Sequence, residues 1–363
     1  MPQRQAFIPP PNPFDRPDAV REDASRHPQG ALDLSIGTPS DAPAPAVIEA
    51  LSRSGLERGY LPSIGTPAYR EAAANWLNRV AGEHVVDPAN LIATVGSKEL
   101  VVGLPHWLRL RRPDLDTVLY PAVSYPSYAM GAELAGCRAV PVRVRKDWTL
   151  DVASIDPADA ARALCLWVAS PGNPTGASED LGAIAAWGRA NGVPIFSDEC
   201  YIEFTWDREP QTVLHHGLEG VVAVHSLSKR SNLAGTRAGF IAGDPEIVGF
   251  LAELRQHLGL LVPGPVQAAA IAAFEDQEPV EAQRSIYYAR LEQLIERLSD
   301  LGIDAPMPSG GFYLWLDVVD GDGWDLANHL AGELGIVTSP GEFYGKVSDN
   351  HLRIAAVRDL GPR

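Results

Sequence analysis

The sequence predicts an α/β protein with two domains. From about residue 46 onward, helical patterns alternate with short apolar runs such as "LIATV", "TVLYP", "ALCLWVAS", "VPIFSDE" and "VVAVHSLS". Apolar strands separated by helices are typical of a mainly parallel sheet that helices cover on both faces. The chain has 363 residues, of which 45% are hydrophobic, and this is enough for two domains with a substantial core.

Three segments follow one another along the chain. Residues 1–45 are rich in proline, which fixes φ and removes a hydrogen-bond donor, so we expect an extended arm that wraps onto a smaller domain. Residues 46–264 carry the alternating pattern and are the predicted large domain. Residues 265–363 begin with a long helical pattern that is interrupted near Pro279. The runs "GGFYLWLDV", "DLANHLAGELG" and "HLRIAAV" follow it, which predicts a small α+β domain.

Composition argues against several classes of function. The net charge is −16 and no basic run is long, which argues against binding to nucleic acid; the short "RLRR" before Pro113 is interpreted as the end of a helix. Cys137, Cys165 and Cys200 are widely separated, without metal-ligand spacing, and fit reduced thiols. No apolar run reaches the roughly 18 residues of a membrane span, and the N-terminus lacks a signal-peptide core. We therefore expect a cytoplasmic protein without a metal or a membrane partner.

Unusual residues follow several of the apolar runs. In open α/β sheets ligands bind at the carboxyl ends of strands, so these loops are the places to search. After "LIATV" comes "GSKE", where the first amides of a helix could hold a phosphate. After "ALCLWVAS" the turn "PGNPTG" presents Asn173, and "VPIFSDECY" places Asp198 at a strand end with Tyr201 three residues later. Taken singly, a capped turn, a bare turn and a structural salt bridge also explain these three patterns.

Lys229 follows a fourth run, in "HSLSKRSNLAGTRAG". The sequence has only four lysines, and the others lie in a charged turn (Lys146), after a "GEFYG" loop (Lys346) and at a helix start (Lys98). A lysine at a strand end can be desolvated, which lowers its pKa and makes the amine a usable nucleophile. A lysine for an aldehyde, a carboxylate for a ring nitrogen, and hydroxyls with an arginine for a phosphate together describe a pyridoxal 5'-phosphate site.

These motifs resemble the class I/II aminotransferases of fold type I. The resemblance runs from "SIGTPSDAPAP" to "LRIA" and includes "GYLPSIGTPAYREA", "SYPSY", "SPGNPTG", "SDECY" and "SLSKRSNLAGTRAG". It implies a mainly parallel seven-stranded sheet in the large domain and pyridoxal 5'-phosphate as the cofactor. It also implies a homodimer that takes amino acid and 2-oxo acid substrates.

The resemblance implies a role for each cofactor residue. Lys229 would form the Schiff base, and Asp198 would pair with the pyridinium nitrogen. Asn173 and Tyr201 would hydrogen-bond the phenolic oxygen. Tyr125 would stack on the ring, although two aromatic residues three positions apart could equally belong to the core. The predicted phosphate site consists of Ser97, Lys98, Ser226, Ser228 and Arg237, with Ser97 and Lys98 contributing through their backbone amides.

Four further positions concern the substrate and the partner subunit. Arg353 in "HLRIA" matches the arginine that takes the substrate α-carboxylate in a bidentate pair, a task suited to a planar guanidinium. Asn173 belongs to the same substrate site, and Gly37 in "SIGTP" matches the backbone position that closes over it. Tyr60 matches a tyrosine that reaches the phosphate of the neighbouring subunit, although simple packing also explains it.

A finer resemblance is to the succinyldiaminopimelate aminotransferases of actinobacteria, through "GSKE", "DECYIEFTW", "HSLSKRSNLAGTRAGF", "GLLVPGPVQAA" and "SPGEFYG". It implies transfer of an amino group from N-succinyl-LL-2,6-diaminopimelate to 2-oxoglutarate in lysine and diaminopimelate biosynthesis. Aminotransferases for aspartate, aromatic or other amino acids stay open, as do a decarboxylase, a carbon–sulfur lyase and a non-catalytic sensor, because the fold alone does not fix the substrate. The distal carboxylates need a second cation, for which the candidates are Lys98, Arg16, Arg21 and Arg230.

Overall fold

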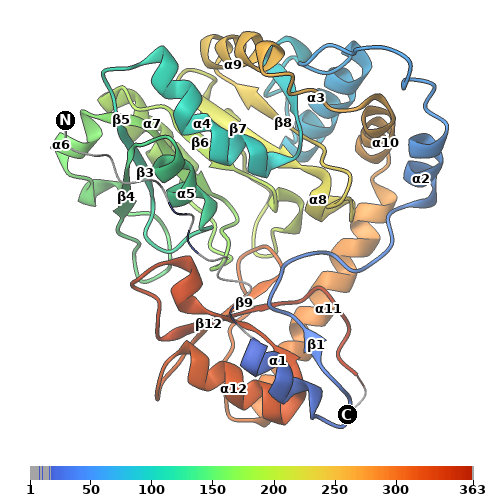
Figure 1. Ribbon diagram of the computed structural model, residues 1–363, viewed down its shortest axis with the longest axis vertical. Helices are drawn as coiled ribbons and strands as arrows, with labels where there is room; N and C mark the ends of the chain where they lie inside the picture. The colour runs from blue at the N-terminus through green and yellow to red at the C-terminus, as the bar shows by residue number, and fades with distance from the viewer. Residues whose placement is uncertain (1–7, 9, 11–15, 17, 362–363) are drawn as a thin grey trace.

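The computed structural model describes residues 8, 10, 16 and 18–361 of the chain. A large sheet with its helices forms the upper part in Figure 1, and a smaller sheet with fewer helices lies below it. The long helix α11 (Glu278–Asp300) runs from the upper part to the lower one. The domain boundaries at residues 45 and 264 stay predictions. In the part of the chain that the structure describes, no helix is long and apolar enough to cross a membrane.

The large sheet has seven strands in the order β2-β8-β7-β6-β5-β3-β4. Only β8 runs antiparallel to its neighbours, so the predicted mainly parallel seven-stranded sheet is confirmed. The last residues of β5 and β6 are in register, Ala169 opposite Asp198, and Asp198 is opposite Val224 of β7. The loops after these three strands therefore begin side by side. The bounds are β2 (Leu91–Thr94), β3 (Thr117–Pro121), β4 (Arg138–Val142), β5 (Ala163–Ala169), β6 (Ile195–Asp198), β7 (Val221–Ser226) and β8 (Gly239–Gly243).

Helices cover both faces of the large sheet. Leu166 and Val168 of β5 pack into one core cluster with α3, α7 and α10, whereas Cys165 and Trp167 face a second cluster with α4, α5 and α9. Burial on both faces explains why these strands are continuous apolar runs. The bounds are α2 (Pro45–Ser52), α3 (Pro67–Ala81), α4 (Ser97–Arg111), α5 (Ser127–Leu134), α6 (Pro157–Ala160), α7 (Leu181–Asn191), α8 (Leu227–Arg230), α9 (Pro245–His257) and α10 (Gly264–Glu275), with the 3-10 turns η2 (Pro88–Asn90), η3 (Val152–Ser154), η4 (Ile202–Phe204) and η5 (Val213–His216).

Local sequence signals set several helix ends. Thr66 caps α3 by accepting a hydrogen bond from the backbone of Tyr69 at 3.2 Å, Pro67 opens the helix, and Gly82 ends it in the left-handed region at φ 75°. The basic run "RLRR" closes α4, as predicted. Pro279 lies at the start of α11, just after the break that separates it from α10, so the predicted interruption is confirmed.

The small sheet is antiparallel, with the order β11-β12-β9. Its apolar faces pack with α11 and α12 into a separate core. A two-stranded parallel pair, β1 with β10, lies beside it. The bounds are β9 (Tyr313–Asp317), β11 (Ser339–Pro340), β12 (His351–Ala355), α12 (Gly323–Leu334), β1 (Leu32–Asp33), β10 (Ile336–Val337) and the 3-10 turn η6 (Gly341–Tyr344).

The expectation of an extended N-terminal arm is wrong for residues 18–25. They form the helix α1 (Asp18–Ser25), and β1 follows it. Val20 and Ala24, four positions apart, lie on one face of α1 and are buried in the core of the small sheet. The high proline content of the preceding residues concealed this short amphipathic helix. Most of residues 1–17 lie outside the described part of the chain.

Candidate active site

The catalytic candidates gather where the strands of the large sheet end. Asn173 follows β5, Asp198 is the last residue of β6, and Lys229 lies in α8 directly after β7. Because the three strands are parallel and in register, these residues lie along one edge of the sheet.

Lys229 is partly buried and hydrogen-bonded. Ser226 caps the short helix α8 by accepting the N–H of Ser228 at 3.1 Å, which fixes the backbone before Lys229. The Nζ of Lys229 donates to the carbonyl oxygen of Gly37 and lies 5.8 Å from the centre of the Phe312 ring. Burial lowers the pKa of Lys229 to about 8, and the positive charge of Arg353 acts in the same direction. More of the amine is therefore neutral near pH 8 than in an exposed lysine.

Asp198 is a carboxylate with two fixed donors. The hydroxyl of Tyr128 donates to Oδ2 at 3.0 Å, and the backbone N–H of Cys200 donates to Oδ1 at 3.3 Å. Burial raises the pKa of Asp198. A carboxylate in such a place is stabilised by a cationic partner, which a protonated ring nitrogen would supply.

Tyr128 is a site residue that the sequence analysis did not select. Its ring stacks on Trp167 at 5.0 Å, and Tyr125 meets it edge-on at 6.0 Å. The spacing of the two tyrosines in "YPSY" was the available signal, because residues three apart at a helix start point to neighbouring positions. Tyr128 holds Asp198, while Tyr125 is partly buried beside it.

Donor groups converge at the start of α4. Gly96 caps this 15-residue helix with φ 70°, and a Cβ there would overlap with the guanidinium of Arg237. Nη1 of Arg237 donates to the Ser228 hydroxyl at 3.4 Å, and the hydroxyl of Ser226 donates to that of Ser228 at 2.9 Å. Guanidinium, hydroxyl groups and a helix N-terminus suit a phosphate. Ser97 and Lys98 are the first residues of this helix, and the Lys98 side chain is exposed.

Arg353 is buried at the other side of the site, with 2% of its surface exposed. From β12 it donates to the side-chain oxygen of Asn173 at 2.8 Å and to the carbonyl oxygen of Ser35 at 2.5 Å. The rings of Tyr313 and Tyr344 lie 4.3 and 4.7 Å from its guanidinium carbon. These contacts fix the plane of the guanidinium, as bidentate binding of a carboxylate requires.

Tyr313 is a second residue that the sequence analysis missed. Its hydroxyl shares a hydrogen bond of 2.8 Å with the hydroxyl of Tyr201, and burial raises the pKa of both groups. A Cβ at Gly37 would overlap with the Tyr313 hydroxyl, so glycine is required there. Gly37 and Tyr313 thus connect Lys229 with Arg353, because Gly37 accepts from Lys229 and the Tyr313 ring contacts the guanidinium. The run "GGFYLW" identifies a strand but not this contact.

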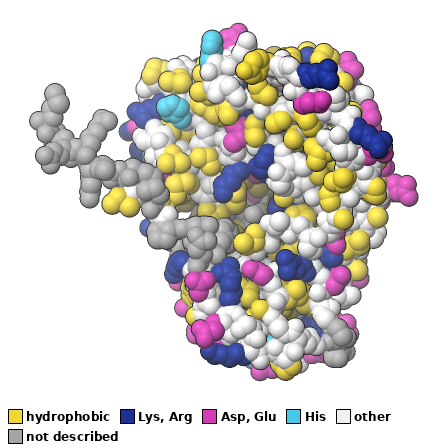
Figure 2. All heavy atoms as spheres, turned by 45° about the vertical axis from the view of Figure 1, so that its right-hand side comes forward, with side chains coloured by type: hydrophobic (Ala, Val, Ile, Leu, Met, Phe, Trp, Pro, Cys, Tyr) yellow, Lys and Arg dark blue, Asp and Glu magenta, His cyan; other side chains and the backbone are white. Residues whose placement is uncertain are grey.

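One predicted site residue stays apart from the others in the single chain. The side chain of Tyr60 is fully exposed, in the segment between α2 and α3. Ile48 of α2 is exposed as well, and hydrophobic side chains are spread over the upper half of the face in Figure 2, on the side where α2 and α10 lie. Acidic and basic side chains are mixed among them on that face.

The candidates for a second cation differ in their surroundings. Arg230 is wrong as a candidate, because it is buried in an ion pair with Glu203 and also donates to the carbonyl oxygen of Ala273 at 2.7 Å. Arg21 pairs with Asp18 at 3.3 Å and with Asp33 at 3.7 Å. Arg16 pairs with Glu342 at 2.9 Å and lies over the rings of Trp324 and Phe343.

Comparison with known proteins agrees with this geometry. Residues 29–359 match the family Aminotransferase class I and II. The chain is 41% identical to 4-dedimethylamino-4-oxo-anhydrotetracycline transaminase OxyQ of Streptomyces rimosus, over 94% of both chains. It is 33% identical to LL-diaminopimelate aminotransferase of Desulforudis audaxviator, over 95% of this chain and 91% of that one. A solved structure of a probable N-succinyldiaminopimelate aminotransferase from Thermus thermophilus has a TM-score of 0.86 at 28% identity and 96% coverage of both chains. The protein therefore belongs to the class I and II aminotransferases of fold type I, which use pyridoxal 5'-phosphate.

Proposed function

We propose that the protein transfers the amino group of N-succinyl-LL-2,6-diaminopimelate to 2-oxoglutarate. The buried guanidinium of Arg353 is the observation that supports the amino acid part of this proposal, because the rings of Tyr313 and Tyr344 hold it and its charge acts on Lys229. The diaminopimelate part is supported by the relatives named for diaminopimelate and succinyldiaminopimelate.

We infer that different residues of the site bind different parts of the cofactor. When it is bound, pyridoxal 5'-phosphate supplies an electron sink for the charge that develops at the substrate Cα. Asp198 would hold the ring nitrogen, Asn173 and Tyr201 the phenolic oxygen, and Tyr125 the ring face. The phosphate would be held by the side chains of Ser226, Ser228 and Arg237 and by the backbone amides of Ser97 and Lys98 at the start of α4.

Two residues have roles toward the substrate. Arg353 would bind the α-carboxylate, which fixes the Cα–H bond relative to the amine of Lys229. Lys229 would then take the proton from the substrate Cα onto Nζ, since its lowered pKa suits proton transfer near neutral pH. The same groups would serve a decarboxylase or a lyase, so product analysis for a 2-oxo acid rather than an amine or ammonia is part of the test.

A second candidate substrate is a polycyclic ketone. It is supported by the 41% identity to a relative named for the transamination of 4-dedimethylamino-4-oxo-anhydrotetracycline. The two candidates differ in charge, because the diaminopimelate derivative brings distal carboxylates that need a cation. Arg16 and Lys98 are the exposed cations we propose for that role.

The substrate proposal is tested with a panel of amino donors and 2-oxoglutarate. We expect N-succinyl-LL-2,6-diaminopimelate to exceed free diaminopimelate, aspartate and aromatic amino acids by at least about tenfold in kcat/KM, because one charge-assisted contact provides that much discrimination.

Arg353→Lys should lower kcat/KM in both half-reactions, since a point charge replaces a planar pair of donors. Arg16→Gln and Lys98→Gln should impair only the half-reaction with the larger substrate. A higher kcat/KM for aspartate or an aromatic amino acid, or for the ring ketone as acceptor with glutamate as amino donor, would reject the proposed substrate.

The active unit is proposed to be a homodimer in the cytoplasm. The exposed Tyr60 and Ile48 favour a second copy of the chain as the partner, and the three free thiols suit a reducing compartment. We expect Tyr60→Ala to weaken cofactor retention by roughly tenfold, the loss of one charge-assisted contact, without changing the dimer. Analytical ultracentrifugation at the assay concentration measures the oligomeric state, and titration with the cofactor measures its retention. A fully active monomer would contradict the dimer, and unchanged retention would leave Tyr60 with a packing role.

A further inference from the structure

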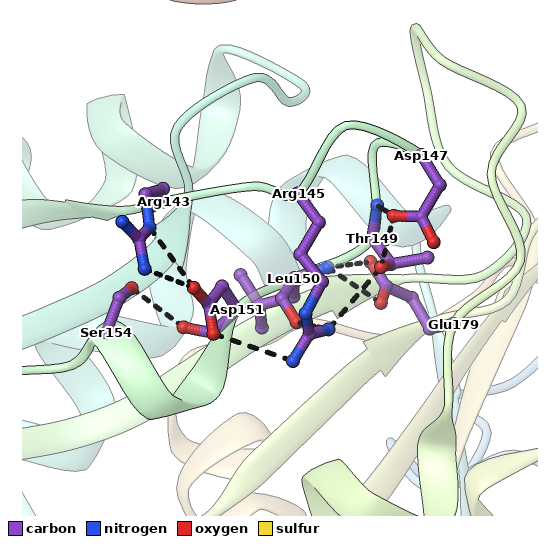
Figure 3. Close-up of polar contacts among 8 residues, drawn as sticks. All are labelled: Arg143, Arg145, Asp147, Thr149, Leu150, Asp151, Ser154 and Glu179. Carbon is purple, nitrogen blue, oxygen red and sulfur yellow. Dashed lines mark hydrogen bonds and ion pairs between the residues drawn. The ribbon is translucent and has the colours of Figure 1, made fainter.

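The segment 143–151 forms a hairpin after the edge strand β4. Val144 and Leu150 pair as an antiparallel bridge, and Figure 3 shows the polar contacts that fix the turn. Asp151 accepts from Arg143 at 2.6 Å and pairs with Arg145 at 3.5 Å. Together these contacts give the hairpin a defined shape although four of its nine residues, Arg143, Arg145, Lys146 and Asp147, are exposed.

Trp148 at the tip of the hairpin has an unusual backbone. Its φ of 66° lies in the left-handed region, which bulky residues rarely occupy. Such a conformation persists only where the surrounding contacts hold it. Asp147 supplies one of them by accepting from both the backbone N–H and the hydroxyl of Thr149, at 3.1 and 2.6 Å. The turn thereby directs the indole of Trp148 toward the small sheet.

The indole of Trp148 contacts two aromatic side chains of the small sheet. It meets His351 edge-to-face at 4.8 Å and Trp315 at 6.0 Å. The rings of Trp315 and His351 are themselves stacked, at 5.1 Å and 7°. The hairpin of the large sheet is therefore in aromatic contact with β9 and β12.

Both contacted residues are neighbours of Arg353. Trp315 is its partner across the β9–β12 pair, and His351 lies two positions earlier on β12. Trp315 also meets the ring of Tyr344 edge-on at 5.8 Å, and Tyr344 lies 4.7 Å from the guanidinium. A displacement of the Trp148 indole would therefore reach the Arg353 guanidinium through two intervening rings, those of Trp315 and Tyr344.

The base of the hairpin contacts the other support of Arg353. The N–H of Leu150 donates to both carboxylate oxygens of Glu179, at 2.9 and 3.1 Å (Figure 3). The N–H of Glu179 in turn donates to the hydroxyl of Ser170 at 3.1 Å. Ser170 begins the loop that carries Asn173, whose side-chain oxygen accepts from Arg353. The hairpin thus joins both elements that hold the guanidinium.

We propose that the 143–151 hairpin is a positioning element for Arg353, and that Trp148 is the positioning residue through which it acts. The hairpin holds the small sheet against the Asn173 loop, so that the guanidinium keeps the orientation in which it binds a carboxylate. Trp148 is not one of the residues to which we assign a contact with the substrate or the cofactor. The inference rests on the proposed role of Arg353 in binding the α-carboxylate.

The test measures carboxylate binding to the holoenzyme apart from chemistry. In Trp148→Ala, the Kd of glutarate, an unreactive dicarboxylate followed through the cofactor absorbance, should rise about threefold to tenfold, the equivalent of one or two aromatic contacts. The KM for glutamate should rise with it, while kcat changes by less than about twofold. Trp148→Phe should restore most of the affinity. Trp187→Ala is the matched control, because this half-buried tryptophan of α7 packs on the core of the large sheet.

Each outcome distinguishes the inference from the function it rests on. If Arg353→Lys leaves the Kd of glutarate unchanged, the proposed role of Arg353 fails. If Arg353→Lys raises that Kd and Trp148→Ala does not, the hairpin has no positioning role. Equal effects of Trp148→Ala and Trp187→Ala would also overturn the inference, because general destabilisation would explain both. Should Trp148→Ala fail to fold, Trp148→Leu, which removes the aromatic contacts but keeps an apolar side chain, and Glu179→Gln carry the test, and a glutarate Kd unchanged in both overturns the inference.

Discussion

Lys229→Ala is expected to abolish transamination, with kcat falling by at least about a thousandfold, because the variant loses both the amine that carries the cofactor and the group that moves the α-proton. No other lysine lies at this strand end: Lys98 starts α4, Lys146 is in the hairpin, and Lys346 follows η6. Single-turnover mixing with glutamate, followed through the cofactor absorbance, measures the loss.

The control for this prediction is Lys346→Ala, an exposed lysine outside the site, which should keep its activity. Cofactor binding to Lys229→Ala should persist in part, because the donors around Arg237 are unchanged. Near-normal turnover by Lys229→Ala would show that another group performs the proton transfer, and the assignment of the site would be wrong.

Asp198→Ala is expected to lower kcat by about a hundredfold or more, the usual cost of removing a charge that stabilises the transition state. Without a carboxylate beside it, the ring nitrogen of the cofactor would lose its proton and withdraw less charge from the substrate Cα. The loss should fall on kcat and leave the Kd of glutarate within about threefold, since Arg353 is untouched.

Tyr128→Phe tests the role of Asp198 with a smaller change. This variant removes the hydroxyl that donates to Oδ2 but keeps the carboxylate and the stacking on Trp167. We expect kcat to fall by about tenfold, as for the loss of one hydrogen bond to a charged group. Unchanged single-turnover kinetics in Asp198→Ala would contradict the role of this carboxylate, whatever Tyr128→Phe shows.

Local sequence patterns predicted the large sheet and the positions along its edge. Apolar runs of strand length determine where β5, β6 and β7 end, and parallel strands in register then place Asn173, Asp198 and Lys229 side by side. The chemical types were also readable, because pyridoxal 5'-phosphate needs a lysine, a carboxylate and phosphate donors together. For these three residues, the position at the end of a strand was enough to predict that they lie at the same edge of the sheet.

Other parts of the site depend on contacts between distant segments. Tyr313 is 112 positions from Tyr201, and Arg353 is 180 positions from Asn173. Neither strand pattern nor residue type indicates which hydroxyl meets which, because that depends on how the small sheet packs against the large one. The same holds for α1, whose two buried residues gain their stability only from the core of the small sheet.

The sequence by itself therefore determined the α/β class, the mainly parallel large sheet, the family and the position of Lys229 and Asp198 at strand ends, since these follow from local periodicity and from the motifs next to the strands. Only the tertiary structure decided that Arg230 forms an ion pair with Glu203. It also decided that Tyr128 hydrogen-bonds Asp198 and that Tyr313 hydrogen-bonds Tyr201. The contact of Trp148 with His351, a neighbour of Arg353, depends on the tertiary structure as well. The physical reason is that a charge, a hydroxyl or an indole has its effect through the partner it meets, and packing of segments far apart in the sequence determines that partner.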